Sequence, residues 1–295
     1  MQSPLLINPN KTYPRPLVEA EGCVEPLVNS EYAEVLAFLE RRPIYTACLA
    51  GLIRDNGLQS GRNRGVFYGY RNHRGELEGV ALLGHATLME ASSDEAIQAF
   101  ARTAQRCNNV HMIMFEENRI DKFWGEYAVA GQEIRHACRQ LLFELRWPIE
   151  VSGVANLRLA TIQDLPLLVP VHAELALAES GIDPNEQDPA GFTERYERRI
   201  EQGRTWVMIE NGKLFFKAEV VAKTPDTTYV EGVWVNPEAR RQGYGRRCMS
   251  QLARMLLWQT KSICLFVNDD NDEARNFYQQ AGYHLRTVYD TVFLR

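Results

Sequence analysis

The sequence predicts a mixed α/β protein with two tandem domains, each a central, mostly antiparallel sheet flanked by helices. The chain of 295 residues is long enough for two ordinary hydrophobic cores. Runs of β-forming residues alternate with helical patterns, and a similar order of elements occurs in both halves. A strand, a loop with two glycines and a helix follow one another over residues 229–247. We place the domains at residues 1–150 and 151–295.

Composition narrows the class of protein. An apolar content of 45% and a charged content of 24% are typical of a soluble globular protein. The net charge of −5 argues against nucleic acid as the main partner. No apolar run approaches the ~20 residues that span a bilayer, and the first residues lack the pattern of a secretory signal. We therefore expect a cytoplasmic protein with no membrane partner.

Cysteine and histidine spacing gives no sign of a metal site. The six cysteines are scattered without a C-x-x-C pair, which indicates reduced, mostly buried thiols. The six histidines form no H-x-x-x-H pair. We expect no metal.

The first half begins with a segment rich in proline and polar residues, in which two short extended stretches are expected near Leu5 and Leu17. Ser30 is a suitable N-cap for a helix, and a second helix is expected over 45–54. The later elements of this half alternate between β and helical patterns. They are strands at 66–71, 110–116 and 141–147, one or two strands over 77–90, and helices at 94–107 and 118–127.

The second half repeats this order. A strand at 156–161 leads to Thr161 and Asp164, which resemble a capping box at the start of a helix. A polar loop at 181–191 precedes a second helix, and Asn211-Gly212 predicts a hairpin. The remaining elements are strands at 205–210, 213–223, 227–235 and 262–267, helices at 243–259 and 271–281, and a closing pair of strands over 283–294.

The repeated order predicts an internal duplication. FEENRIDKFWGEY at 115–127 is similar to FVNDDNDEARNFY at 266–278, with an asparagine and an aromatic pair in matching places. The alternative is that any two α/β domains look alike at this level of detail.

The stretch from 229 to 247 has the features of a phosphate site. Pro237 ends the strand because it has no N–H to donate. Gly243 and Gly245 lack Cβ atoms, so a ligand can approach the backbone where a helix begins. The helix start is already positive, so cations there repel it and one another unless an anion binds between them. Those cations are Arg240, Arg241, Arg246 and Arg247.

These residues resemble a known family. The run Arg-x-x-Gly-x-Gly from Arg240 to Gly245 is similar to the coenzyme A pyrophosphate loop of the GNAT superfamily of acyl-CoA N-acyltransferases. The stretch 265–285 resembles the second signature of that family, a strand followed by Asn-x-x-Ala-x-x-x-Tyr on a helix and then Gly-Tyr. The matching residues are Asn271, Ala274, Tyr278, Gly282 and Tyr283.

The resemblance implies acetyl-CoA (coenzyme A) as co-substrate and assigns its contacts. The amides of Gln242, Gly243, Tyr244, Gly245 and Arg246 are expected to hold the pyrophosphate, with Arg240 or Arg241 reaching the 3′-phosphate. Backbone groups of Val233, Trp234 and Val235 are expected to pair with the pantetheine arm, and one N–H to polarise the thioester carbonyl. Asn271 is expected to cap the helix and contact the coenzyme, and Ala274 to leave room for it.

The same resemblance makes Tyr278 the general acid for the departing thiolate; otherwise it is a packed aromatic beside Phe277. Glu231 is a candidate base for the attacking amine. Strand alternation puts Glu231 on the same face as Val233 unless a bulge intervenes. The alternatives to Glu231 as base are an ion pair between Glu231 and Lys217, Tyr229 as the base, or a chain of waters.

The first half lacks the phosphate-binding features. Its matching junction contains Glu90, Asp94 and Glu95, with no glycine pair and no arginine, and acidic side chains there repel a pyrophosphate. We expect no coenzyme A at that place. In the second half, acidic residues around the first two helices would favour a cationic acceptor, or they only form a solvated loop. They are Glu174, Glu179, Asp183, Glu186 and Asp188.

Two functions follow from this. The first is an N-acetyltransferase that transfers an acetyl group from acetyl-CoA by direct attack in a ternary complex, with its active site in the C-terminal half. Its acceptor is a small-molecule amine or a protein amino group, and an oligomer is compatible with it. The alternative is a non-catalytic acyl-CoA-binding or sensing module.

Overall fold

The computed structural model describes residues 22–128 and 131–295, and the chain groups by its contacts into two units. Unit 1 contains Met1–Leu142, Val267–Asp272 and Leu285–Arg295, and unit 2 contains Phe143–Phe266 and Glu273–His284. This grouping differs from a single division at residue 150 because the last strand of the chain groups with the first half. The stretches expected near Leu5 and Leu17 lie outside the described residues.

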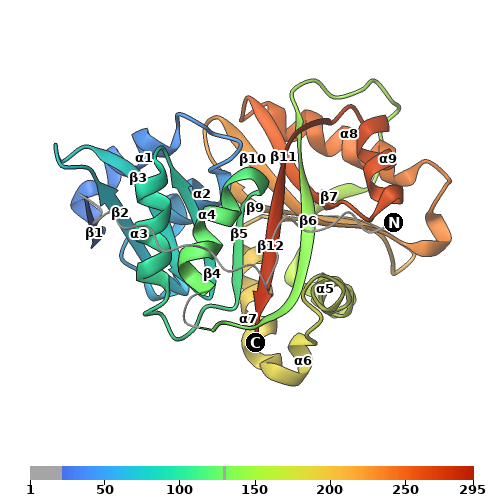
Figure 1. Ribbon diagram of the computed structural model, residues 1–295. Coiled ribbons are helices and arrows are strands. Elements are labelled where there is room, and N and C mark those ends of the chain that lie inside the picture. Colours follow the sequence, from blue (N-terminus) through green and yellow to red (C-terminus); the bar gives the residue numbers. More distant parts are fainter. Residues whose placement is uncertain (1–21, 129–130) are drawn as a thin grey trace. The chain divides into compact units, whose positions relative to one another are not determined.

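Unit 1 is a mixed sheet with helices (Figure 1). Its strands lie in the order β1-β2-β3-β4-β5-β12-β6. In the described part of unit 1, β4 pairs with β5 in parallel, whereas the pairs β1–β2, β2–β3, β3–β4 and β5–β12 are antiparallel. The elements are β1 (Cys23–Pro26), α1 (Tyr32–Leu39), α2 (Ala47–Asn56), β2 (Gly65–Arg71), β3 (Leu77–Gly84), β4 (Ala86–Ala91), α3 (Asp94–Ala104), β5 (Met112–Glu116), α4 (Glu117–Tyr127), β6 (Ile134–Leu145, its last residues in unit 2) and β12 (His284–Leu294).

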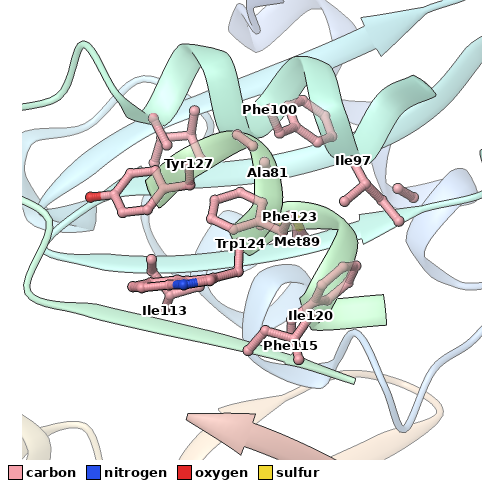
Figure 2. Packing of buried hydrophobic residues seen from close by; sticks show 14 of the residues in the cluster. Ala81, Met89, Ile97, Phe100, Ile113, Phe115, Ile120, Phe123, Trp124 and Tyr127 are labelled. Atoms are coloured by element: carbon pink, nitrogen blue, oxygen red, sulfur yellow. The ribbon is translucent and has the colours of Figure 1, made fainter. Parts of the chain in front are cut away.

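Strand β3 shows why helices cover both faces of unit 1. Successive side chains of a strand point to opposite faces. Ala81 and Leu83 join the core cluster of α3 and α4, whereas Val80 and Leu82 join the cluster of α1 and α2. Figure 2 shows the first cluster, in which Phe123, Trp124 and Tyr127 of α4 gather with residues of α3 and β5, the indole of Trp124 lying beside Ile113. Because both faces are buried, β3 is a nearly continuous apolar run.

Unit 2 repeats this plan with its strands in the order β11-β10-β9-β8-β7. The β10–β11 pair is parallel, and β7–β8, β8–β9 and β9–β10 are antiparallel. The elements are β7 (Leu157–Leu159), α5 (Leu165–Ser180), α6 (Pro184–Gln187), α7 (Pro189–Glu201), β8 (Thr205–Glu210), β9 (Lys213–Lys223), β10 (Thr227–Val235), α8 (Tyr244–Leu257), β11 (Ser262–Asn268, its last residues in unit 1) and α9 (Asp272–Gln280).

Neighbouring residues of β8 again face different helices. Val207 packs in a cluster with Leu168 of α5 and Tyr196 of α7. Met208, the next residue, has its Sδ atom 3.6 Å from Sγ of Cys248 on α8. The sheet of unit 2 therefore lies between α5 and α7 on one face and α8 on the other.

Several local expectations are confirmed. The capping box forms: the Thr161 N–H donates to Oδ2 of Asp164 at 2.8 Å. Asn211 and Gly212 both have positive φ, 50° and 73°, as a two-residue hairpin turn requires. Strand β10 ends at Val235, two residues before Pro237.

Other local expectations were wrong. The closing pair of strands is one long strand, β12, and the strand expected at 141–147 already begins at Ile134. The polar loop at 181–191 contains the short helix α6, which begins at Pro184. Only Cys248 and Cys264 of the six cysteines are fully buried. Within the described residues, no helix is long and apolar enough to cross a membrane.

Candidate functional site

Strands β10 and β11 separate part-way along their length. Their parallel pairing covers three residue pairs, from Thr227–Ser262 to Tyr229–Cys264. Beyond Tyr229, β10 stays registered with β9 but has no register partner on β11 in the part of the chain that the structure describes. Backbone groups that leave a ladder need other partners. This edge of β10 can therefore accept an extended ligand as an added strand.

A bulge interrupts β10 at the same place. Glu231 is registered with Glu219 and Trp234 with Lys217, and the register shifts between these two pairs. Gly232, between them, has a φ of 59°, which glycine adopts without a Cβ penalty. The bulge breaks the alternation that would place Glu231 on the same face as Val233, and it redirects the amides that follow.

The loop after β10 has the shape of an anion-binding turn. The Asn236 side chain accepts from the N–H of Glu238 at 3.0 Å and fixes the chain as it leaves the strand. Arg241 and Gly243 have φ values of 60° and 79°, both left-handed. Alternation of right- and left-handed residues turns successive N–H groups into one concavity, which suits a phosphate. Nε of Arg240 donates to the carbonyl of Val235 at 3.2 Å, which ties the loop to the strand.

Helix α8 begins with unsatisfied donors. Its N-cap is Gly243, and no side chain caps the first turn. The N–H groups of Tyr244, Gly245 and Arg246 therefore have no intrahelical acceptor. Around them, Arg240, Arg241, Gln242, Gly243 and Arg246 are exposed. The structure thus brings the predicted amides and guanidinium groups together at one helix start.

The two glycines of the loop differ in their surroundings. A Cβ atom built on Gly243 would have no atom within 4 Å. One built on Gly245 would lie 2.9 Å from Cγ2 of Val235 and 3.1 Å from Cε2 of Phe277. Gly243 is therefore open to a ligand. Gly245 is needed for close packing of α8 against β10 and α9, which corrects the expectation that both glycines make room for a ligand.

Helix α9 carries the predicted acid. Tyr278 is buried, and its ring packs edge-on against Phe277 at 5.1 Å and Tyr283 at 5.5 Å. Burial raises the pKa of Tyr278, so its phenol stays protonated at neutral pH. Among the residues described, its hydroxyl makes no hydrogen bond, so both proposed roles, packing and proton donation, are open to it. Ala274 lies one turn earlier on α9.

Asn271 precedes α9, in the short segment that groups with unit 1. Its backbone N–H donates to the carbonyl of Asn268 at 3.0 Å. Its role as helix cap and coenzyme contact stays a prediction.

Glu231 does not form the ion pair with Lys217 that was an alternative to its role as base. Lys217 binds Glu219 instead, and both side chains are fully buried. Glu231 accepts a hydrogen bond from the Tyr229 hydroxyl at 3.1 Å, and its Oε1 lies 3.8 Å from Nη1 of Arg199. Sequence reasoning missed Arg199 and Glu219. The signal for Glu219 is a charged pair, Lys217 and Glu219, within the apolar run of β9.

Of the five acidic residues predicted near the first two helices of unit 2, Asp183 and Asp188 cap helices, whereas Glu174, Glu179 and Glu186 are exposed. Asp183 and Asp188 accept from the N–H groups of Asn185 and Gly191, so they cap α6 and α7. Glu179, at the end of α5, is exposed. Partial desolvation and the nearby charge of Glu231 raise the pKa of Glu179 above its usual range.

Comparison with known proteins identifies the second half. Residues 172–283 match the model of the acetyltransferase (GNAT) family. These residues form a GNAT domain. A UPF0039 protein from Schizosaccharomyces pombe is 26% identical over 97 residues. That match covers 33% of this chain and 65% of the relative, so the chain spans less than two thirds of the relative's length.

Solved structures show the same fold over most of the chain. A GNAT-family acetyltransferase from Colwellia psychrerythraea has a TM-score of 0.57 at 13% identity, covering 92% of this chain and 100% of its own. A Drosophila protein has a TM-score of 0.66 at 13% identity, covering 92% and 98%. A tandem GNAT protein from the clavulanic acid biosynthesis pathway has a TM-score of 0.55 at 12% identity, covering 92% and 98%. The fold is that of GNAT acetyltransferases.

Proposed function

We propose that this protein is an N-acetyltransferase that moves the acetyl group of acetyl-CoA to an amine by direct attack in a ternary complex, in its C-terminal GNAT domain. One observation carries the proposal. The uncapped start of α8, with its left-handed loop and arginines, directly follows a strand that has an open, bulged edge. A diphosphate and an extended amide-containing arm need these two features in this order.

In this proposal the coenzyme is bound mainly by backbone. The amides from Gln242 to Arg246 hold the pyrophosphate, and Arg240 or Arg241 binds the 3′-phosphate. The open edge of β10 over Val233–Val235 pairs with the pantetheine arm. One of its N–H groups, redirected by the bulge at Gly232, donates to the thioester oxygen as negative charge develops there.

The chemical step needs one base and one acid. Glu231, directly or through water, accepts a proton from the acceptor ammonium, whose nitrogen lone pair then attacks the thioester carbonyl carbon. The carbon–sulfur bond breaks as the tetrahedral intermediate collapses. Tyr278 donates its proton to the departing sulfur. The attacking nitrogen loses a second proton as the amide forms, which restores Tyr278, and the proton held by Glu231 passes to solvent. The products are the amide and free coenzyme A.

The acceptor in this proposal is a small-molecule amine or a protein amino group, and a cytoplasmic location suits the supply of acetyl-CoA. Glu179 and Glu231 interact electrostatically, which favours an acceptor that arrives as a cation. The N-terminal half is a GNAT-like copy that has lost the coenzyme loop.

Thiol release from acetyl-CoA, measured against a panel of amines, tests this function. We expect turnover with at least one amine, and its loss in an Arg240→Ala/Arg241→Ala variant through weaker coenzyme binding. Arg195→Ala, which removes an exposed arginine on α7, is the matched control and should leave the coenzyme affinity unchanged. Coenzyme binding unaffected by the double variant would contradict the assignment of the loop.

One observation favours the second candidate, a non-catalytic acyl-CoA-binding or sensing module. Glu231 already contacts Tyr229 and Arg199, as a structural carboxylate would. Tight binding of acetyl-CoA without thiol release from any amine would decide for that candidate, provided that Tyr278→Phe also leaves binding unchanged.

A further inference from the structure

The two units place a glutamate at the same register position. In unit 1, β4 and β5 pair in parallel over three residue pairs that end at Leu88–Met114, and Glu90 lies two residues beyond. In unit 2, the parallel pairing of β10 and β11 ends after three pairs at Tyr229–Cys264, and Glu231 lies two residues beyond. Glu90 and Glu231 are therefore equivalent positions, each just past the point where two parallel strands separate.

In unit 1 this glutamate is locked by an arginine. Nη1 of Arg42 donates to both carboxylate oxygens of Glu90, at 2.9 and 3.1 Å. The same guanidinium also donates to Glu116, the register-equivalent residue on β5, at 2.8 and 3.1 Å. The side chains of Glu90 and Glu116 are each only 10% exposed. Both oxygens of Glu90 are thus occupied by this guanidinium, which shields the carboxylate from a ligand.

In unit 2 an arginine also lies near the equivalent glutamate, Glu231, but does not hydrogen-bond to it. Arg199, on α7, hydrogen-bonds to Glu219 with its Nη1 atom, whereas the same atom is 3.8 Å from Glu231. Glu231 keeps 39% of its side chain exposed. The two units differ at Glu219 on the neighbouring strand β9. Glu219 binds the guanidinium of Arg199 and keeps it away from Glu231.

Glu219 is itself fixed from several sides. It is fully buried and pairs with Lys217, and the Tyr196 hydroxyl donates to it at 3.2 Å. Nδ1 of His172 lies 3.3 Å from Oε1 of Glu219. A Cβ atom on Gly232 would lie 3.0 Å from Oε1 of Glu219, so the β10 bulge rests directly on this group.

We propose that Glu219 is a positioning residue: it holds Arg199 back from Glu231, so that Glu231 is screened by a positive charge but stays open to the acceptor amine. The base role of Glu231 rests on the proposed function, whereas the contacts among the three side chains do not. The charged and titratable groups around Glu231 come from four elements. They are Tyr229 on β10, Arg199 and Tyr196 on α7, Glu219 and Lys217 on β9, and Glu179 and His172 on α5.

The proposal predicts opposite changes in the pKa of Glu231 for two variants. Glu219→Gln removes a nearby negative charge and releases Arg199 toward Glu231, and both changes lower the pKa of the exposed Glu231 carboxyl. Arg199→Gln removes the screening positive charge and raises this pKa. The measurement is a carbon-13 NMR titration of the protein labelled at glutamate carboxyls, with the Glu231 signal assigned by its loss in Glu231→Gln.

Arg198→Gln is the matched control, since it removes an exposed arginine next to Arg199 on α7. It should leave the pKa of Glu231 unchanged. A pKa that moves in the same direction in both test variants, or in neither, would overturn the proposal. Because the titration needs no turnover, its failure is distinct from failure of the proposed function. If Glu219→Gln does not fold, the Arg199→Gln shift against Arg198→Gln still decides whether Arg199 screens Glu231.

Turnover gives an independent readout that a purely structural role would not produce. We expect Glu219→Gln to lower kcat about tenfold, within the range of a general base, with KM for acetyl-CoA changed less than twofold. Adding Arg199→Gln to Glu219→Gln should restore most of the lost kcat, because the guanidinium that closes on Glu231 is gone. A double variant less active than Glu219→Gln alone would show that Glu219 only stabilises the fold.

Discussion

At the scale of single residues, Gly243 and Gly245 show how one motif serves two purposes. Gly243 has a left-handed φ and open space around it, whereas Gly245 lies against Val235 and Phe277. A sequence motif treats the two positions alike. The structure separates a position that a ligand can approach from a position that packing requires.

The two roles can be distinguished by how an alanine substitution at each glycine changes the unfolding free energy of the protein. Gly243→Ala should cost about 1–2 kcal/mol because alanine disfavours the left-handed conformation. Gly245→Ala should cost about 1–3 kcal/mol through overpacking. Urea unfolding measures both. Only the second loss should be partly restored by Val235→Ala, which removes the methyl group in the way. Equal restoration at both positions would contradict the distinction.

Tyr278 supports a second prediction at this scale. Its raised pKa keeps the phenol protonated at neutral pH, so the side chain is a donor wherever the enzyme works. Tyr278→Phe removes only the hydroxyl and keeps the ring packing against Phe277 and Tyr283. We expect kcat to fall at least tenfold, toward the ~100-fold typical of a lost general acid, with the melting temperature nearly unchanged.

Acetyl-CoA affinity measured by calorimetry is the control for Tyr278→Phe. It should stay within about twofold of the wild-type value, because the pyrophosphate and pantetheine contacts are elsewhere. Unchanged kcat in this variant would mean that Tyr278 only packs, and the thiolate would then take its proton from water.

At the scale of elements, helix starts in this protein are satisfied in two different ways. The 3₁₀ turn Ile162–Asp164, which leads into α5, is closed by its own residues: Asp164 accepts from Thr161 and forms a bidentate pair with Arg158 at 2.7 and 2.9 Å. The start of α8 has no side-chain cap and is surrounded by arginines. Helices α1, α2, α4 and α5 also lack a side-chain cap, so it is the cluster of arginines around the open amides that favours a ligand at α8.

The capped turn before α5 makes stability depend on pH. The Arg158 guanidinium and the Thr161 N–H and hydroxyl lower the pKa of Asp164 to about 2, against ~3.9 in an unfolded chain. The charged form is therefore stabilised by folding. Its contribution is fully present above about pH 4 and is lost as the pH falls toward 2.

Asp164→Asn should therefore cost about 1 kcal/mol of unfolding free energy at pH 7, the usual value of a lost N-cap, and much less at pH 2. Urea unfolding at both pH values measures this. Asp183→Asn, at the start of the four-residue helix α6, is a control that should change stability little at either pH. A cost of Asp164→Asn that does not shrink at low pH would contradict the assignment.

At the scale of the whole molecule, the chain contains two related units that differ at the place where their parallel strands separate. Unit 2 leaves the separation of its parallel strands open beside an uncapped helix. Unit 1 fills the equivalent place with Arg42 and Arg119 bound to Glu90 and Glu116. The start of α3, where a coenzyme loop would stand, is capped by Ser93 and carries Asp94 and Glu95.

We therefore predict one coenzyme site per chain. Calorimetric titration of the full chain with acetyl-CoA should give a stoichiometry of about one. A concentration of 100 times Kd should stabilise the fold by about 2.7 kcal/mol, seen as a higher melting temperature. Arg240→Ala/Arg241→Ala should remove most of this effect. Two equivalents bound, or binding that survives the double variant at full strength, would contradict the prediction.

Local patterns made much of the fold predictable. Strand and helix positions follow from apolar periodicity, and the turn at Asn211-Gly212, the Thr161–Asp164 box and the end of β10 before Pro237 follow from the chemistry of single residues. The predictions were wrong where pairing with a strand distant in the sequence determines the structure. The long strand β12 is defined by pairing with β5, and this pairing is between residues more than 150 positions apart. No local pattern contains that information.

The sequence by itself determined the mixed α/β class and the helix start near residue 243, because glycines, proline and clustered arginines act through neighbouring residues. Only the tertiary structure decided which groups meet Glu231. Arg199, Glu219 and Tyr229 come from a helix and two strands, and the bulge at Gly232 sets which way the carboxylate faces. Strand pairing and burial bring these charges together, and neither can be read from residues that are neighbours in the chain.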